Sequence, residues 1–108
     1  MITYNDFQKL EIKIGTIKEA EKIEKSDKLI KLIVDLGEEE LRTIVAGIGQ
    51  KYSPEDLIDK QIPILTNLEP RELFGVLSNG MILAANDSDD LPVLLHPDKK
   101  IKSGSKIS

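Results

Sequence analysis

The chain has 108 residues, of which 40% are hydrophobic and 31% charged, and this length and composition predict one folded, soluble domain spanning residues 1–108. The absence of cysteine excludes disulfide bonds and thiolate catalysis and is typical of a cytoplasmic protein, and no apolar run approaches the ~20 residues of a membrane span. A net charge of −4 by itself argues against nucleic acid as a partner.

The charge is unevenly distributed along the chain. Residues 1–34 carry seven Lys and six acidic residues, whereas residues 35–98 carry four cations and thirteen acidic residues. Residues 99–108 carry four Lys and no acidic residue. This distribution weakens the argument against nucleic acid, although a lysine-rich terminus is most often simply solvated.

The first predicted elements are a short helix over residues 3–10, for which Thr3 is the expected N-cap, and a strand over residues 10–17. Apolar and charged residues alternate in that strand, as they do in a half-buried strand. Gly15 within it indicates a bulge or a sharp bend of the sheet. We interpret residues 18–25 as a continuation of the strand followed by a loop.

Residues 28–36 and 41–45 are predicted to be two strands that pair as a β-hairpin. We interpret the three acidic residues 38–40 at its turn as solvated charge, with a metal site as the less common alternative. Gly47 and Gly49 follow without the remaining glycines of a phosphate-binding loop. They therefore indicate a bend at a barrel corner.

The clearest helix start in the chain lies at residues 53–57. Ser53 is the expected N-cap, Pro54 takes the first helical position, and the two acidic residues that follow complement the positive end of the helix dipole. The helix must be short, because a fourth strand over residues 61–67 follows at once. Pro63 lacks a backbone N–H, so it indicates an edge or bulge position in that strand.

A structured loop over residues 67–81 follows the fourth strand, and strands over residues 81–85 and 91–95 come after it. The loop contains one cation, Arg71, and loops held by a rigid sheet are common places for binding residues. Five main strands with one short helix between the third and fourth predict an all-β fold, the five-stranded barrel of an OB-fold, with an SH3-like barrel or a sandwich as competitors.

No catalytic arrangement is found in the sequence. His96 is the only histidine; it precedes Pro97 in a predicted turn and has no nucleophile motif such as G-x-S-x-G nearby. Zinc-site and EF-hand spacings are absent, and no carboxylate lies in apolar surroundings that would raise its pKa. The sequence therefore favours binding over catalysis and predicts neither a cofactor nor a metal.

OB barrels bind oligonucleotides on the face of strands two and three and in the adjoining loops. Lys28 and Lys31 in the second predicted strand, Arg42 in the third and Arg71 in the loop are candidates to converge there, although most strand lysines are ordinary exposed cations. Phe74 either stacks on a base or belongs to the core. The shortage of exposed aromatic residues favours a folded RNA recognised through its shape and phosphates.

Several blocks of sequence carry a resemblance to a known family: F-Q-K-L-E-I-K-I-G-T-I at 7–17, D-K-L-I-K-L-I-V-D-L-G at 27–37, R-T-I-V-A-G-I at 42–48, Y-S-P-E-D-L at 52–57, residues 67–81 and P-D-K-K-I-K-S-G-S-K-I at 97–107. The chain resembles the tRNA-binding domain of free-standing dimeric tRNA-binding proteins and of methionyl-tRNA synthetases, where the domain is a β-subunit or the C-terminal domain. The resemblance implies an OB-fold core over residues 8–86, an extension over residues 87–108 in a homodimer interface, and tRNA binding without catalysis.

The resemblance also implies which residues lie near the RNA, and the predicted second strand adds one more lysine; the full set is Lys28, Lys31, Arg42, Asn67, Arg71, Ser78 and Met81. Ser78 is expected to donate a hydrogen bond to phosphate or ribose, and Met81 to pack beneath the loop. The family loop is usually more basic, of the kind L-K-P-R-K-L-R-G, whereas Glu69, Glu72 and Phe74 stand here. Fewer cations should weaken phosphate binding and its salt dependence.

The predicted function is tRNA binding by a homodimer. This homodimer is expected to be an accessory, β-subunit-like partner of a methionyl-tRNA synthetase catalytic chain. Such a partner would hold tRNA largely independently of sequence and raise its local concentration. The chain is not expected to be an enzyme, although such a subunit carries a ligase label by association. The alternative is a chaperone-like or protein-interaction OB-fold dimer with weak RNA affinity, which the acidic surplus of residues 35–98 favours.

Overall fold

The computed structural model describes all residues from 1 to 108, and almost all of its regular structure is β-strand. Its elements in chain order are α1 (Tyr4–Gln8), β1 (Ile12–Lys22), β2 (Ile30–Asp35), β3 (Arg42–Ala46), a 3₁₀ turn (Pro54–Asp56), β4 (Gln61–Leu65), β5 (Arg71–Leu73), β6 (Val76–Ser78), β7 (Met81–Ile82), β8 (Ala84–Asn86) and β9 (Pro92–Leu94). The predicted strands are present with ends that differ by a few residues, except that the one expected over residues 81–85 is divided into β7 and β8 of two different sheets. The stretch predicted as a loop contains two further strands, β5 and β6.

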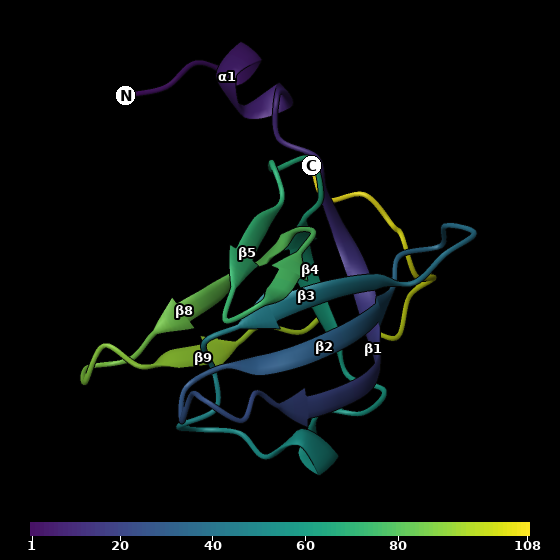
Figure 1. The fold of residues 1–108 in the computed structure, drawn as a ribbon. Helices are drawn as coiled ribbons and strands as arrows, with labels where there is room; N and C mark the ends of the chain where they lie inside the picture. The colour runs from purple at the N-terminus through teal and green to yellow at the C-terminus, as the bar shows by residue number, and fades with distance from the viewer.

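The main sheet is antiparallel and has the strand order β3-β2-β1-β4-β7 (Figure 1). The long strand β1 belongs to both halves of this sheet, since its residues 12–16 pair with β4 and its residues 16–22 pair with β2. The register shifts between Ile17 and Glu19, so the expected bulge lies at Lys18 and not at Gly15. Gly15 is instead required by packing, because a Cβ atom there would lie 2.5 Å from Val34 Cγ1.

The sheet curls into a nearly closed barrel because its edge strand β3 meets the end of β6 and the residue that follows it. Asn79 donates its backbone N–H to Thr43 O at 2.8 Å, and the Val45 N–H donates to Ser78 Oγ at 2.9 Å. Inside lies an aliphatic core of twelve buried residues: Ile17, Ile30, Leu32, Val34, Leu36, Ile44, Ala46, Ile48, Leu57, Ile62, Ile64 and Leu94. This architecture confirms the OB-fold prediction of a five-stranded barrel.

Pro63 lies in the interior of the sheet, and the expected edge position is wrong. Strand β4 has β1 on one side and β7 on the other. Pro63 O accepts the Leu83 N–H at 3.1 Å, but Pro63 has no N–H to return a bond to Leu83. Pairing with β4 therefore ends after Ile82, and the chain leaves the main sheet to form the β8–β9 ribbon.

The helix expected after Ser53 is only a 3₁₀ turn at Pro54–Asp56. Ser53 occupies the predicted N-cap position and Pro54 the first position of the turn, but the Ser53 side chain makes no capping hydrogen bond. Leu57, which follows the turn, is completely buried in the core. The short connection therefore serves to place one leucine beneath the barrel, and it has no room for a longer helix before β4 begins.

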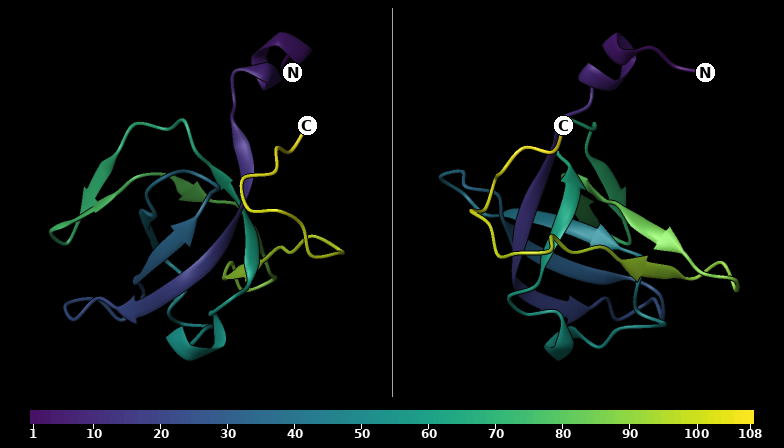
Figure 2. Two further views of the ribbon diagram at one scale, coloured as in Figure 1. Left: turned by 90° about the vertical axis from the view of Figure 1, so that its right-hand side faces the viewer. Right: turned by 180° about the vertical axis from the view of Figure 1, so that it is seen from behind.

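The last residues of the chain run along the first half of β1 and cover its open edge (Figure 2). The Gly104 N–H donates to Ile14 O at 2.7 Å, and the Ile107 N–H donates to Ile12 O at 2.8 Å. Gly104 and Leu36 are in close contact, because a Cβ atom on Gly104 would lie 2.4 Å from Leu36 O. Within the expected extension over residues 87–108, this part is thus held by the barrel of the same chain.

The helix α1 stands away from the barrel at its upper end (Figures 1 and 2). Its predicted start is confirmed, because Thr3 and Asp6 exchange the two hydrogen bonds of a capping box. None of its residues is buried, although Tyr4 and the following Leu10 are large and apolar. In this structure no helix combines the length and the apolar character needed to cross a membrane.

Candidate functional site

The loop between β4 and β7 is itself a β-hairpin, formed by β5 and β6. Arg71 pairs with Ser78 at its base and Leu73 with Val76 at its tip. The two residues of the turn, Phe74 and Gly75, have φ angles of 50° and 80°, which both lie in the left-handed region. Such two-residue turns match the twist of a hairpin, so the sequence closes the hairpin locally and projects its tip away from the barrel.

The hairpin tip faces the turn that follows β1, and an open groove of about 560 Å³ lies between them. In Figure 2 (left) the green hairpin and the blue-violet turn after β1 project to the same side of the barrel. We call this hollow the tip groove; it is lined by Glu21, Lys22, Ile23, Glu24, Lys25, Lys31, Phe74 and Val76. Three lysines and one exposed aromatic ring therefore share one concave surface.

The charges in the tip groove are only partly neutralised. Lys31 Nζ lies 3.5 Å from Glu21 Oε1, whereas Lys22 and Lys25 take part in no ion pair. Glu24 is exposed at the same turn. Two lysines are thus available to an anionic ligand, and a third is held at the wall of the groove by an exposed and therefore weak ion pair.

The base of the hairpin carries Arg71 beside a second, smaller hollow of about 40 Å³. This base hollow is lined by Val45, Leu68, Glu69, Arg71, Leu73, Ser78, Gly80 and Met81. Arg71 is exposed, and its side chain makes no ion pair or hydrogen bond with the rest of the chain. Met81 is partly exposed in the same wall, so its thioether contributes an apolar surface beside the cation.

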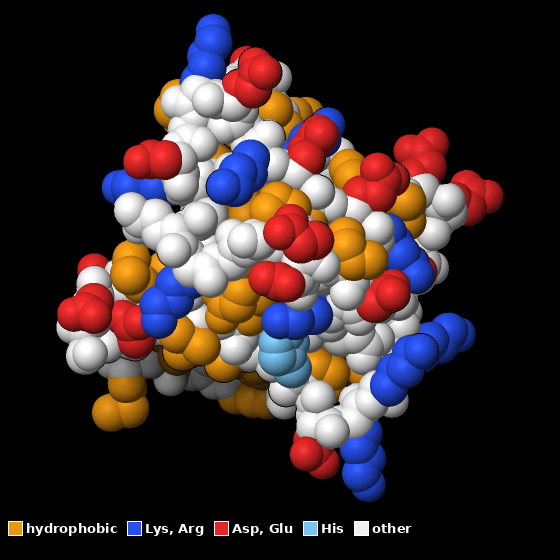
Figure 3. Space-filling view, turned by 90° about the horizontal axis from the view of Figure 1, so that it is seen from below, with side chains coloured by type: hydrophobic (Ala, Val, Ile, Leu, Met, Phe, Trp, Pro, Cys, Tyr) orange, Lys and Arg blue, Asp and Glu red, His pale blue; other side chains and the backbone are white.

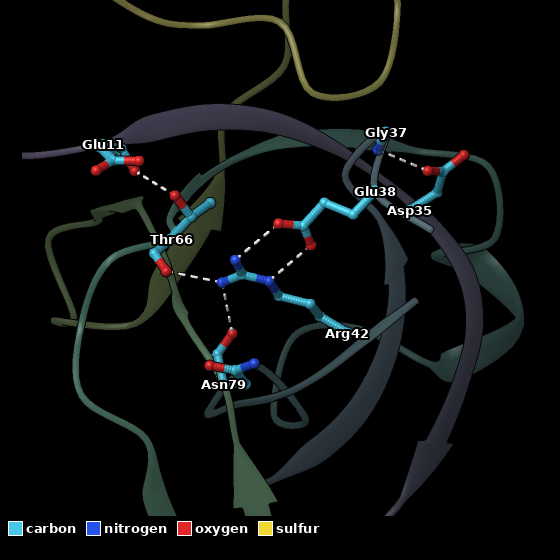
Figure 4. Close-up of polar contacts among 7 residues, drawn as sticks. All are labelled: Glu11, Asp35, Gly37, Glu38, Arg42, Thr66 and Asn79. Atoms are coloured by element: carbon cyan, nitrogen blue, oxygen red, sulfur yellow. Dashed lines mark hydrogen bonds and ion pairs between the residues drawn. The ribbon is translucent and has the colours of Figure 1, made fainter. Parts of the chain in front are cut away.

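Arg42 is the most extensively hydrogen-bonded cation of the protein (Figure 4). Its Nε and Nη2 atoms donate to the two carboxylate oxygens of Glu38, each at 2.9 Å. Its Nη1 donates to the backbone oxygens of Thr66 at 2.7 Å and Asn79 at 3.4 Å. With only 19% of its side chain exposed, Arg42 joins the β2–β3 turn, the end of β4 and the end of the hairpin.

The electrostatics of this cluster are those of a paired carboxylate. The hydrogen bonds from Arg42 hold the pKa of Glu38 below its usual value, although partial desolvation raises it, and the charges of Arg42 and Lys13 lower it further. Glu39 and Glu40 are exposed and have no ion-pair partner. The interpretation of residues 38–40 as solvated charge therefore needs correction for Glu38.

Ser78 and Asn67 use their polar side-chain atoms for hydrogen bonds within the chain. Ser78 is buried; its hydroxyl accepts from the Val45 N–H at 2.9 Å and donates to Gly80 O at 3.1 Å. Asn67 Oδ1 accepts from the Glu11 N–H at 2.9 Å, and Asn67 Nδ2 donates to Lys9 O at 2.7 Å. Both side chains thus fasten the loop to neighbouring segments.

The residues predicted as a single surface are therefore divided among several places. The tip groove contains Lys31, and the base hollow contains Arg71, Ser78 and Met81. Lys28 is exposed but precedes β2 and lines neither hollow, so its expected place within the second strand is wrong. Arg42 and Asn67 lie at the junction where the loop leaves the barrel.

Lys22 and Lys25 are members of the tip groove that sequence reasoning did not identify. A usable signal existed, because the charged residues of 18–25 end the first strand of an OB barrel and so must lie beside its loops. The structure contains no group of three or more His, Asp or Glu side chains placed to hold a metal ion. His96 Nδ1 lies 2.7 Å from the backbone oxygen of Gln61 and makes no side-chain contact typical of a catalytic base.

The face seen in Figure 3 has acidic and basic side chains interspersed over its whole area. No continuous basic stripe crosses it, as the negative net charge would suggest. On this face, a polyanion would therefore meet cations only in small local groups.

Comparisons with known proteins agree with the observed fold. The sequence model of the family described as "Putative tRNA binding domain" matches residues 12–106. A methionine–tRNA ligase from Methanococcoides burtonii is 56% identical over 107 residues, which is 99% of this chain but 16% of the ligase. The chain thus spans about one sixth of the length of the curated relatives that it matches.

Two solved structures match the fold over its whole length. A protein described as MetRS related, from Pyrococcus horikoshii, has a TM-score of 0.93 and 38% identity, and the match covers 100% of this chain and 98% of that one. The chaperone CsaA from Bacillus anthracis has a TM-score of 0.91 and 34% identity, with coverage of 100% and 99%.

Proposed function

We propose that this chain, which belongs to the tRNA-binding domain family, is a non-catalytic module that holds tRNA largely independently of nucleotide sequence. The observation that carries this proposal is the tip groove, in which three lysines line one concave wall of an OB barrel next to the β5–β6 hairpin. Lysines in a groove of this kind neutralise phosphates without reading bases. Such a module acts where tRNA is used, which places it in the cytoplasm.

The predicted site residues take two different roles in this proposal. Lys28, Lys31 and Arg71 are exposed or partly exposed cations, and we assign them to phosphate contacts together with Lys22 and Lys25 of the tip groove. Arg42, Asn67 and Ser78 have their polar atoms engaged within the chain, so they act as positioning residues for the hairpin. Met81 packs at the base of the hairpin beside Arg71.

The acidic residues of the loop set the strength of this binding. Glu69 lines the base hollow with Arg71, and Glu72 is exposed on β5. Each negative charge near a phosphate opposes binding, so the affinity should be modest and should fall less steeply with salt than that of a more basic loop. A modest affinity suits an accessory module that keeps tRNA near a catalytic partner rather than one that sequesters it.

The kind of partner is suggested by the relatives. Methionine–tRNA ligases contain a segment that is 56% identical to this chain. We therefore propose a methionyl-tRNA synthetase catalytic chain as the partner, with the ligase activity belonging to that chain and none to this domain. In this arrangement the module raises the local tRNA concentration and lowers the KM of the synthetase for tRNA.

The molecule is proposed to act as a homodimer. The helix α1 contributes no buried residue in the single chain, and 72% of Tyr4 is exposed there. Leu10, which follows the helix, is also exposed, so apolar side chains are left uncovered just before β1, along which the C-terminal segment runs. A second copy would cover both, and the segment over residues 87–108 would then contribute to the dimer as expected from its resemblance.

A second candidate function rests on the similarity to the CsaA chaperone structures and on the net charge of −4. In that case the same barrel would present its hairpin to protein clients and would bind RNA weakly.

The experiment that tests the proposed function is a fluorescence titration of labelled bulk tRNA at low and at near-physiological salt. Saturable binding that weakens with salt is expected. Absence of binding even at low salt would overturn the tRNA-binding proposal and leave the chaperone-like one.

A further inference from the structure

Phe74 occupies a backbone conformation that its side chain does not favour. Its φ of 50° lies in the left-handed region, where a bulky aromatic residue is uncommon and strained. Asparagine or glycine would adopt the same turn conformation with less backbone strain. The fold therefore gains nothing from a phenylalanine at this position of the hairpin.

Packing within the chain does not explain Phe74 either. The side chain is 60% exposed and is not among the apolar residues that pack against the core. The neighbouring Gly75 has no atom within 4 Å of the place where a Cβ would stand, so the hairpin tip is surrounded by open space. A strained and uncovered residue at a loop tip is typical of a contact with a ligand.

The surroundings of Phe74 indicate the chemistry of that ligand. The ring lines the tip groove together with Lys22, Lys25 and Lys31, while Ile23 and Val76 supply the remaining apolar wall. An aromatic face beside several ammonium groups fits a molecule that has a flat ring and a phosphate within a few ångströms of each other. A nucleotide has both parts, whereas an apolar peptide would leave the lysines without partners.

We infer that the tip groove takes an unpaired nucleotide of a bound RNA, with its base stacked on Phe74 and its neighbouring phosphates held by Lys22, Lys25 and Lys31. Bases in a regular duplex are already stacked on one another and are closed to such a contact, so the groove selects loops, bulges and ends. This inference rests on the proposed function and deepens it by naming the part of the RNA that is bound. It also adds a stacked base to the shape and phosphate contacts that the sequence favours.

The groove has a size and an openness that suit this role. Its volume of about 560 Å³ is open to solvent, so a nucleotide can enter without any movement of the barrel. The hairpin that carries Phe74 is joined to the barrel through Ser78 and Asn79, which holds its tip at the groove that the lysines also line. The stacking surface is therefore largely formed before the ligand arrives.

The test uses two RNAs with the same number of phosphates, a stem-loop and a blunt duplex, and follows the binding of each to the intact chain. Phe74→Ala should weaken binding of the stem-loop about tenfold, the size expected for the loss of one stacked base, and should leave the duplex unchanged. Phe74→Leu keeps an apolar side chain without an aromatic face and should behave like the alanine variant. Leu77→Ala, which removes an exposed apolar residue of the same hairpin outside the groove, is the matched control and should change neither affinity.

Phe74→Trp provides a direct reading of the contact, because the chain contains no other tryptophan. Its fluorescence should be quenched by the stem-loop and not by the duplex. The Phe74 variants should also leave the slope of affinity against salt unchanged, since they remove no charge, whereas Lys22→Ala should reduce it.

Two results would overturn the inference: equal loss of affinity for stem-loop and duplex in Phe74→Ala, or native affinity of Phe74→Ala for the stem-loop. In both cases the native chain still binds RNA, so the proposed function stands. If the native chain binds neither RNA at low salt, the proposed function itself fails and the inference fails with it.

Discussion

Glu38 and Arg42 are joined by two parallel hydrogen bonds of 2.9 Å across the turn between β2 and β3. The pair aims the remaining nitrogen of Arg42 at Thr66 O and Asn79 O, so one ion pair connects three segments that are distant in sequence (Figure 4). Asn79 follows directly on β6, so its bond to Arg42 helps to hold the β5–β6 hairpin. The position of the hairpin therefore depends on the Glu38 carboxylate, which orients Arg42.

We predict that Glu38→Gln destabilises the protein at neutral pH by about 1 kcal/mol, since two charge-assisted hydrogen bonds are lost but solvent screens a partly exposed pair. The pKa of Glu38 is lowered in the folded protein by its hydrogen bonds to Arg42. Its stabilising contribution is therefore fully present above the unfolded value of about 4.5 and is lost as the pH falls through the folded value. Urea unfolding of both proteins over a range of acidic pH measures this.

The matched control is Glu39→Gln, because Glu39 is exposed in the same turn and has no ion-pair partner. It should leave the free energy of unfolding unchanged at every pH. A stability difference between Glu38→Gln and the native protein that stays constant down to strongly acidic pH would contradict the assigned role of the carboxylate.

The sequence is sufficient to predict the barrel but not the hydrogen-bond partners of its polar side chains. The strands follow from alternation and turn residues, which are local properties. Arg42, Asn67 and Ser78 are predicted RNA contacts because they match motif positions, and Arg42 also because it lies in the third predicted strand. Arg42 bonds to the nearby Glu38. Asn67 bonds to Glu11, and Ser78 to Val45, which are both far away in sequence. Whether a polar side chain points inward depends on tertiary packing, and no local pattern reports it.

The same limit explains two of the differences between the predicted and the observed fold. An edge position is predicted for Pro63 because a proline interrupts a ladder, yet the interruption falls on the side of β7, where pairing ends after Ile82. Ser53 and Pro54 are a strong helix-start signal, but Leu57 must enter the core three residues later. Tertiary packing thus decided the outcome over a correct local preference.

Ser78→Ala should lower stability and leave RNA affinity nearly unchanged. The hydroxyl accepts from the buried Val45 N–H, and removal of it leaves that donor without a partner, which costs about 1–3 kcal/mol. Thermal unfolding monitored by circular dichroism gives the loss, with Ser88→Ala in an exposed turn as the control. A folded Ser78→Ala protein that binds tRNA several-fold more weakly would instead favour a direct contact of the hydroxyl with RNA.

Gly15→Ala should destabilise the barrel by about 1–3 kcal/mol, because the added Cβ would lie 2.5 Å from Val34 Cγ1 and 2.8 Å from Ile64 Cδ1. Gly47→Ala is the matched substitution, since its nearest neighbour would be Leu29 Cδ2 at 3.9 Å. Chemical denaturation of the two variants under identical conditions provides the comparison. Equal stability of both variants would mean that the core yields around residue 15.

The proposed homodimer predicts a mass twice that of one chain by light scattering at micromolar concentration. The double variant Tyr4→Ser/Leu10→Ser should shift the protein towards the monomer, because it makes two exposed apolar side chains in α1 and just after it polar. Leu95→Ser changes an exposed apolar residue elsewhere and should leave the mass as it is. A native mass equal to one chain would refute the dimer.

Arg71→Ala should weaken tRNA binding more than Lys18→Ala does. Both side chains are exposed cations, but Arg71 lies at the base of the β5–β6 hairpin, whereas Lys18 lies at the bulge of β1 and lines neither hollow. If Arg71 neutralises one phosphate, its removal should also reduce the slope of log affinity against log salt by about 1. Titration of labelled tRNA at several salt concentrations gives both quantities for each variant. Equal effects of the two substitutions would mean that cations act through the overall charge of the protein, and the hairpin would then not be the binding site.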